Sequence, residues 1–372
     1  MRNPDWTTLP TNPMERIGSL LIADDVSDFL RLRAVCHPWR SSTVATKNRT
    51  DCLYPRNWIM LSNPDSSPAD VRFFNTSTHK SFSFNLTRYL DTYSLYQSFD
   101  SLFLLKHKLT EGFALLNPFM KSLTCLPSKI ESKCAKAPLQ LEDLIRKKSF
   151  YFSGVFVTSS SMIVLVFSFL DFLVWTRPGD ESWVYADAKH KIQCFSNVLF
   201  YKDRLLTIDG EKGLMQINLA NEMPDQLQVE VVIPLCKLPD FNDALYLVDC
   251  GGDIILVTFL PDDASQEHFW ESFEMYKLDL NDKTYVRSPN LGSRSIFLGE
   301  NRTFSVSCDD LSSVPAKCIY FCNLYYGDTA CYNLKTNRVR YQSCKPFLRP
   351  SSLVKKLIGY CLRTHWEIVD EE

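Results

Sequence analysis

A short pattern occurs three times in this sequence, as Met215-Gln-Ile-Asn-Leu219, Met275-Tyr-Lys-Leu-Asp-Leu280 and Ala330-Cys-Tyr-Asn-Leu334. In each copy polar residues alternate with apolar ones and the segment closes on Asn or Asp followed by Leu, which predicts a strand with one buried face. A polar turn follows the last two copies, at Asn281-Asp-Lys283 and Lys335-Thr-Asn337. Strands and turns that recur along a chain are typical of the four-stranded blades of a β-propeller.

The sequence around these copies has the same character from about residue 70 onward. Its longest apolar stretch, from Met162 to Trp175, has 14 residues, fewer than the roughly 20 that a helix needs to cross a bilayer. We expect two buried strands there, joined near residues 168–171.

The number of blades follows from the length of the chain. The 322 residues after position 50 correspond to about seven blades at about 45 residues each. Six blades are expected instead if the segment from Lys129 to Lys148, which is predicted to be helical, lies outside the repeat. An array of two-sheet sandwiches is the alternative fold.

The first 50 residues predict three short helices. Asn12-Pro13-Met14-Glu15 is a candidate helix start, because Asn can cap, Pro suits the first turn and Glu can reach back to the cap. Asp24 or Asp25 can cap a second helix, and Pro38 can open a third. The first helix carries one apolar stripe: Met14, Ile17, Leu20 and Leu21. A core of this size is rarely stable alone, so the segment either binds a partner or packs on the large domain.

Two motifs frame this helical segment. Trp6-x-x-Leu9-Pro10 precedes it, and Asp25-x-x-x-Phe29-x-x-x-Arg33-x-Val35-Cys36-x-x-Trp39-Arg40-Ser41 ends it. In this order they resemble an F-box, a module that binds a Skp-type adaptor and through it a cullin and a ubiquitin-conjugating enzyme. Met14 stands where leucine is commoner in that family, and Pro38 interrupts the usual close of the motif. The resemblance implies an apolar adaptor-binding surface formed or supported by Leu9, Pro10, Met14, Ile17, Leu20, Val35, Cys36 and Trp39.

Blocks of the β region carry a second resemblance. Phe172-Leu-Val-Trp-Thr-Arg-Pro-Gly-Asp-x-x-Trp183, the segment from Cys194 to Leu205, and the segment from Phe297 to Val306 followed by Cys318-Ile-Tyr-Phe321 are similar to the KIB-type β-propeller domain. In large plant families that domain follows an F-box. The usual closing Trp-x-x-Pro is present only in part, as Phe347-Leu-Arg-Pro350. The expected fold is therefore mainly β with a small all-α N-terminal module: a three-helix F-box followed by a six- or seven-bladed β-propeller.

We expect four consecutive regions. Residues 1–50 would form the F-box helical module, 51–70 a linker and 71–350 the propeller. Residues 351–372 would form a C-terminal amphipathic helix and an acidic tail, and this helix would either pack on the propeller or enter a partner's groove.

Composition and motifs argue against several classes of protein. The sequence contains no phosphate-binding loop, no nucleophile elbow and no zinc-protease motif, so we expect a non-catalytic protein without a cofactor. None of the 13 cysteines forms a CxxC pair, which predicts packing thiols and no metal site. A net charge of −2 argues against a nucleic-acid partner. Without an apolar leader or a spanning segment, we expect no membrane association and no secretion, and a location in the nucleus, the cytoplasm or both.

The two resemblances together imply a substrate-recognition subunit of an SCF-type ubiquitin ligase, whose propeller binds an unknown target protein. Because propeller binding faces are built from loops, Arg177, Asp180 and Trp183 are candidate target-binding residues. Two other classes stay open: a propeller-based protein-binding or inhibitory factor that acts without ligase assembly, and a propeller enzyme with titratable groups in its central channel.

Overall fold

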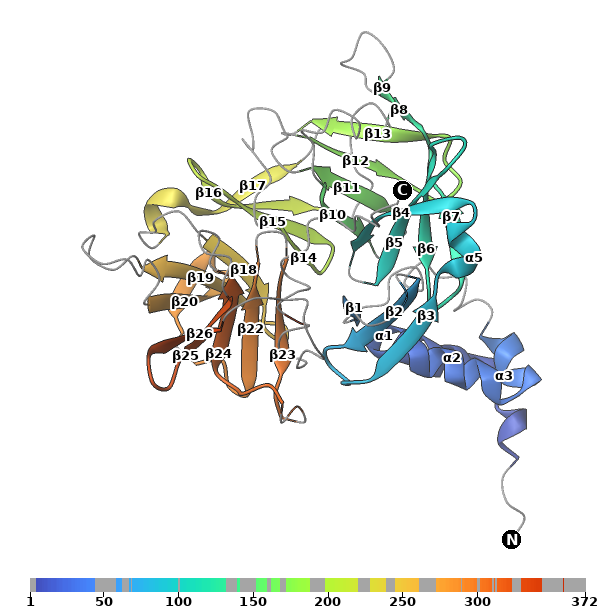
Figure 1. Cartoon of the computed structure of the whole chain (residues 1–372), viewed down its shortest axis with the longest axis horizontal. Coiled ribbons are helices and arrows are strands. Elements are labelled where there is room, and N and C mark those ends of the chain that lie inside the picture. The colour runs from blue at the N-terminus through green and yellow to red at the C-terminus, as the bar shows by residue number, and fades with distance from the viewer. Residues whose placement is uncertain are drawn as a thin grey trace.

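The computed structural model shows a ring of β-sheets with three helices along one side, next to strands β1–β3 (Figure 1). No helix among the described residues is long and apolar enough to cross a membrane. The structure describes residues 5–43, 58–61, 67, 69–99, 101–131, 139–140, 152–158, 162–167, 172–187, 198–219, 228–238, 245–260, 272–288, 290–299, 302–309, 311, 313–322, 329–342 and 357.

The N-terminal segment folds into the three predicted helices. A short 3-10 turn, η1 (Trp6–Thr8), precedes α1 (Thr11–Asp24), α2 (Val26–Val35) and α3 (His37–Ser42). Asp25 separates the first two helices: its backbone N–H donates to the Leu21 carbonyl and its side chain caps α2. The predicted cap of α1, Asn12, is wrong: the helix begins two residues earlier than predicted, at Thr11, and Pro10 occupies the cap position without a side-chain bond.

The β part of the chain forms six sheets. The first contains β1 (Trp58–Leu61), β2 (Asp70–Asn75) and β3 (Ser81–Asn85); after α5 (Thr87–Leu90), the second contains β4 (Tyr93–Phe99), β5 (Leu102–His107), β6 (Phe113–Asn117) and β7 (Ser122–Cys125). The third contains β8 (Lys129–Glu131), β9 (Leu139–Gln140), β10 (Phe152–Val157), β11 (Ile163–Phe167), β12 (Phe172–Thr176) and β13 (Ser182–Asp187).

The remaining sheets continue this order around the ring. The fourth contains β14 (Leu199–Tyr201), β15 (Arg204–Asp209), β16 (Gly213–Asn218) and β17 (Val229–Pro234), and η3 (Leu235–Lys237) follows it. The fifth contains β18 (Leu245–Asp249), β19 (Ile254–Leu260), β20 (Ser272–Asp279) and β21 (Thr284–Arg287). The sixth contains β22 (Arg294–Leu298), β23 (Thr303–Ser307), β24 (Cys318–Cys322), β25 (Thr329–Asn333) and β26 (Arg338–Gln342).

The six sheets are the blades of a β-propeller. The propeller therefore has six blades and not seven, and the fold is not an array of two-sheet sandwiches. The first strands of the fourth and fifth blades, β14 and β18, contact each other, and β18 also contacts β23 of the sixth blade. The three repeated segments are equivalent in the fold. They form β16, β20 and β25, and each lies next to the last strand of its sheet.

The Asn and Asp residues that close these segments have a structural role. Asp279 Oδ1 accepts hydrogen bonds from the backbone N–H groups of Asn281 and Asp282 at 2.8 and 3.0 Å. Asn333 Oδ1 does the same for Lys335 and Thr336. Short polar side chains at these positions therefore fix the turns that start the outermost strands.

The segment from Lys129 to Lys148 is not helical where the structure describes it. Residues 129–131 form β8, which pairs in parallel with β13, and residues 139–140 form β9; the rest lies outside the described residues. Ile130 is fully buried and packs in the same cluster as Trp183. This distant contact outweighs the local helical tendency of the sequence.

Both ends of the predicted propeller also differ from expectation. Trp58–Leu61 lies within the predicted 51–70 linker but forms β1, which pairs antiparallel with β2 of the first blade. In the predicted C-terminal helix only residue 357 is described: Leu357 is helical and fully buried against a cluster that includes Ile59 and Tyr320. The remaining residues of 351–372 lie outside the described part of the chain.

Candidate functional site

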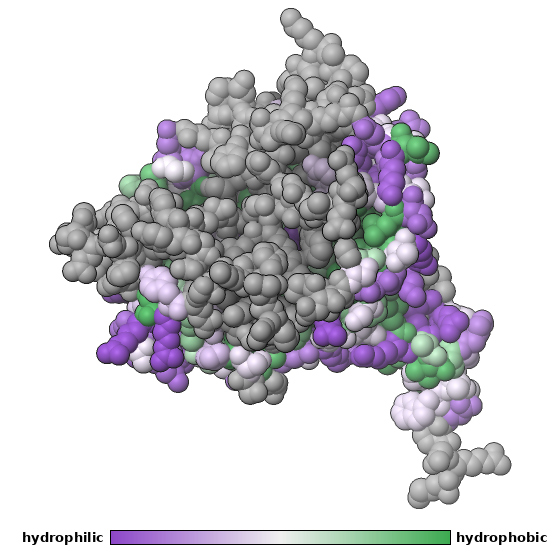
Figure 2. Space-filling view, in the orientation of Figure 1, coloured by the Kyte–Doolittle hydropathy of each residue, from purple (hydrophilic) through white to green (hydrophobic). Residues whose placement is uncertain are grey.

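The N-terminal helices expose large apolar side chains. Ile17 and Leu20 lie three residues apart on α1, and therefore on one face, with exposed fractions of 39% and 64%. Val35, at the end of α2, is 62% exposed, and Trp6, in η1, is 63% exposed. Figure 2 shows apolar surface on this part of the molecule. This small module therefore exposes several large apolar side chains.

The other residues predicted for this surface have more varied positions. Pro10 is exposed and Leu9 is half-buried at the start of α1, and Cys36 is half-buried before α3. Met14 is fully buried, so it supports the helices from inside and cannot touch a partner. Trp39 is half-buried, and its indole N–H donates to the Trp6 carbonyl at 2.8 Å, which holds η1 against α3.

Two arginines of the F-box motif, Arg33 and Arg40, form hydrogen bonds that connect the end of α2 with α3. The Arg33 guanidinium donates to the Arg40 carbonyl at 2.9 Å and to the Thr43 hydroxyl at 2.8 Å. Arg40 returns a bond to the Arg33 carbonyl at 3.1 Å. Sequence reasoning assigned no role to this pair, although the motif contains both residues. Arg33 and Arg40 therefore fix the relative orientation of α2 and α3.

A buried carboxylate fastens α2 to the first blade. Asp25 is 1% exposed, and its Oδ1 accepts hydrogen bonds from the Ser27 N–H at 2.9 Å and from the Trp58 indole N–H at 3.3 Å. The Lys80 ammonium lies 3.4 Å from Asp25 Oδ2 and 2.8 Å from Asp28 Oδ2. Its hydrogen bond to Asp28 lowers the pKa of that carboxyl group and raises the pKa of Lys80.

Apolar contacts complete this attachment. Val26 of α2 packs in one cluster with Trp58 and Phe73 of the first blade, and Phe29 packs against Leu21 and Met120. The helical segment therefore packs on the large domain, which was one of the two alternatives expected from the sequence. It does so through α2, while α1 keeps Ile17 and Leu20 exposed.

The three predicted target-binding residues do not share an environment. Asp180 is exposed, but its carboxylate accepts the Arg177 backbone N–H at 2.8 Å and closes the turn between β12 and β13. The Arg177 guanidinium lies 5.3 Å from the centre of the Trp175 ring. Trp183 is fully buried and donates its indole N–H to the Pro127 carbonyl at 2.6 Å. The expectation of an exposed Trp183 is wrong: it is a core residue.

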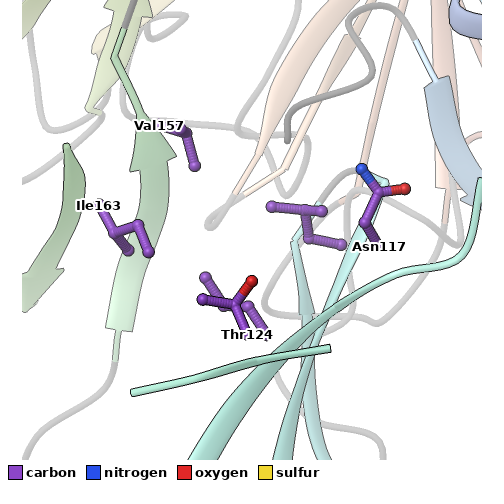
Figure 3. Close-up of a pocket in the computed structure, with 6 residues that line it drawn as sticks. Asn117, Thr124, Val157 and Ile163 are labelled. Carbon is purple, nitrogen blue, oxygen red and sulfur yellow. The ribbon is translucent and has the colours of Figure 1, made fainter. Parts of the chain in front are cut away.

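A narrow pocket lies between the second and third blades. Figure 3 shows Asn117, Thr124, Val157 and Ile163 facing the gap between the two sheets. It has room for about one water molecule. The Asn117 side-chain oxygen already accepts the backbone N–H groups of Phe119 and Met120. This pocket offers no ligand-binding chemistry.

The described thiols are all free, but they do not all pack in the core. Cys318 is buried, and Cys308 and Cys331 pack against the same cluster, whereas Cys125 and Cys236 are exposed. Within the described ranges no group of three His, Cys, Asp or Glu residues is placed to hold a metal ion.

Comparisons with known proteins agree with this architecture. F-box/kelch-repeat protein At1g57790 of Arabidopsis thaliana is 23% identical over 352 residues, 90% of this chain and 86% of that protein. F-box protein At2g26160 of Arabidopsis thaliana is 20% identical over 342 residues, 86% of this chain and 96% of that protein. Among solved structures, the β-propeller domain of Cps50 (Swd1) from Myceliophteria thermophila is 11% identical, with a TM-score of 0.32. The match covers 74% of this chain and 81% of that chain, and the likeness is distant.

The sequence model of the family described as KIB1-4 beta-propeller matches residues 73–340 of this chain. The resemblance to F-box proteins with a KIB-type propeller is thereby confirmed, and no enzyme family is indicated. Because the match covers most of the chain and coincides with the blades, the protein belongs to the KIB1-4 β-propeller family.

Proposed function

We propose that this protein is the substrate-recognition subunit of an SCF-type ubiquitin ligase. In this role the N-terminal helices bind a Skp-type adaptor, which connects them to a cullin, and the propeller binds a target protein. The subunit has no catalytic step of its own. It raises the local concentration of target lysines near the charged conjugating enzyme. Such a subunit works in the nucleus, the cytoplasm or both.

One observation carries the proposal: α1 leaves Ile17 and Leu20 exposed although α2 of the same module is packed on the propeller. A helical segment that served only to complete the large domain would bury such side chains. Relatives named as F-box proteins, similar over nearly their whole length, support the same assignment. The attachment through Asp25 and Lys80 also supports it, because it joins the proposed adaptor-binding helices to the propeller.

Replacing Leu20 with aspartate is expected to lower adaptor binding at least about tenfold, since a charge would then have to be buried at the centre of an apolar contact. The measurement is co-purification of a co-expressed Skp-type adaptor with the full-length chain. Leu109→Asp is the matched control, because Leu109 is 89% exposed on the propeller, in the turn between β5 and β6. This variant is expected to bind the adaptor as the wild type does.

Equal capture by the Leu20→Asp variant and the wild type would contradict the proposed surface. No capture by the wild type would contradict the ligase role itself. That second result would leave the protein as a propeller-based binding factor that acts without ligase assembly.

A further inference from the structure

An open pocket with polar residues in its lining lies where strands of several blades meet. Its volume is about 240 Å³, and it is open on one side. Blades one, four, five and six all contribute to its lining, and its polar end is formed by Asp249, Gly251, Arg294, Thr303 and Ser305. A pocket of this size can receive one peptide side chain with its adjoining backbone.

Arg294 is the only Lys or Arg among the residues that line this pocket. Its Nε and Nη2 donate to the Ser305 hydroxyl at 3.0 and 2.9 Å. That hydroxyl donates in turn to the Asp249 carbonyl at 2.6 Å, so its one hydrogen and both lone pairs are used. The guanidinium is therefore held in one orientation before any ligand arrives.

Among the described residues, no hydrogen-bond acceptor is recorded for the remaining nitrogen of Arg294, Nη1. No carboxylate lies within 4.0 Å of the Arg294 guanidinium among the described residues. Nη1 lies beside Gly251, where an added Cβ would come within 3.2 Å of it. Gly251 has a φ of +73°, a backbone conformation that favours glycine. The missing side chain also leaves room for the guanidinium of Arg294. Burial raises the pKa of the neighbouring Cys250 thiol to about 11, so that thiol is uncharged at neutral pH.

Asp249 contributes the one carboxylate of the pocket. Its Oδ1 accepts the Gly252 backbone N–H at 2.7 Å. Its Oδ2 has no hydrogen-bond partner among the described residues and can accept another. An oriented cation with a carboxylate acceptor in the same pocket matches a peptide, which offers an acidic side chain and a backbone N–H together. A bare inorganic anion would satisfy only the cation.

We propose that this pocket binds an acidic segment of the target protein, with Arg294 holding the anionic group of one side chain, a carboxylate or a phosphate. The inference rests on the proposed function, because it names the chemistry by which the propeller recognises its target. Charge-assisted bonds from a preorganised guanidinium are among the stronger contacts that a protein makes. Arg294 is thus a target-binding candidate in addition to Arg177 and Asp180, which stay predictions.

The test uses the full-length protein labelled with ¹⁵N-arginine and three peptides: acetyl-Ala-Glu-Ala-amide, its phosphoserine counterpart and its glutamine counterpart. The Nε–H signal of Arg294, identified by its loss in Arg294→Gln, is expected to shift saturably with at least one acidic peptide. The dissociation constant of the glutamine peptide should be about 10- to 100-fold higher, because only a charged acceptor gains the charge-assisted bonds. The glutamate and phosphoserine peptides distinguish a carboxylate from a phosphate as the group that is held.

Control variants separate recognition from folding. Arg340→Gln removes an exposed arginine on β26 and should leave peptide binding unchanged. Arg294→Lys keeps the charge without the planar fork and should bind more weakly than the wild type but better than Arg294→Gln. Equal shifts with the glutamine peptide, no shift with either acidic peptide, or unchanged binding by folded Arg294→Gln would overturn the proposal. Adaptor capture by Arg294→Gln should match that of the wild type, so a failure of the ligase role is seen separately.

Discussion

Replacing Trp183 with alanine is expected to lower the free energy of unfolding by about 3–5 kcal/mol. The ring is fully buried, in a cluster that includes Ile130, Val155 and Val174. Its truncation would leave a large cavity and would also remove the bond to the Pro127 carbonyl. Urea unfolding followed by circular dichroism measures the loss directly.

Two further variants make this result specific. Trp183→Phe keeps most of the packing but loses the indole N–H, so it should cost about 1–3 kcal/mol. Trp6→Ala removes a tryptophan that is 63% exposed and should change stability by less than about 0.5 kcal/mol. A Trp183→Ala protein as stable as the wild type would show that the residue is not part of the core.

Replacing Asp25 with alanine is expected to cost about 2–4 kcal/mol. The change removes the cap of α2, leaves the buried Trp58 indole N–H without its acceptor and separates Lys80 from one of its two carboxylates. Because Asp25 lies between the helical module and the first blade, the loss should loosen their attachment as well as α2. Hydrogen exchange of the backbone amides in β1 and α2 would report that loosening.

The matched control is Asp25→Asn, which keeps an oxygen for the Ser27 and Trp58 donors, removes the charge and puts an NH2 group where Oδ2 accepts from Lys80 and Thr78. Since Lys80 is 37% exposed and keeps Asp28, this variant should lose no more than about 1 kcal/mol. Equal losses for the two variants would mean that the charge matters and the hydrogen bonds do not. A loss below about 0.5 kcal/mol for Asp25→Ala would contradict the role of this residue in the attachment.

Much of the architecture could be predicted because it depends on local patterns. The alternation in the three repeated segments predicted strands, and these became β16, β20 and β25. Helix signals within a few residues of one another likewise predicted the N-terminal module.

The candidate sites were predicted less well, because periodicity says which side of an element is apolar but not what covers it. Met14, Ile17 and Leu20 share one helical stripe, yet Met14 is buried and Leu20 is exposed. Trp183 follows a turn and looked accessible, but β8 from a distant part of the chain pairs with its strand. Arg294 gave no signal in the sequence, because its role depends on Ser305 and Gly251.

The sequence by itself determined the strands, the turns closed by Asp279 and Asn333, and the helical module, since each rests on interactions between residues close in the chain. Only the tertiary structure decided the six blades, the burial of Trp183, the attachment of α2 and the orientation of Arg294. The bonds behind the last three join residues 56, 55 and 56 positions apart, from Trp183 to Pro127, from Lys80 to Asp25 and from Ser305 to Asp249. Each of these contacts joins the helical module to the first blade or one blade to its neighbour, so no local pattern encodes it.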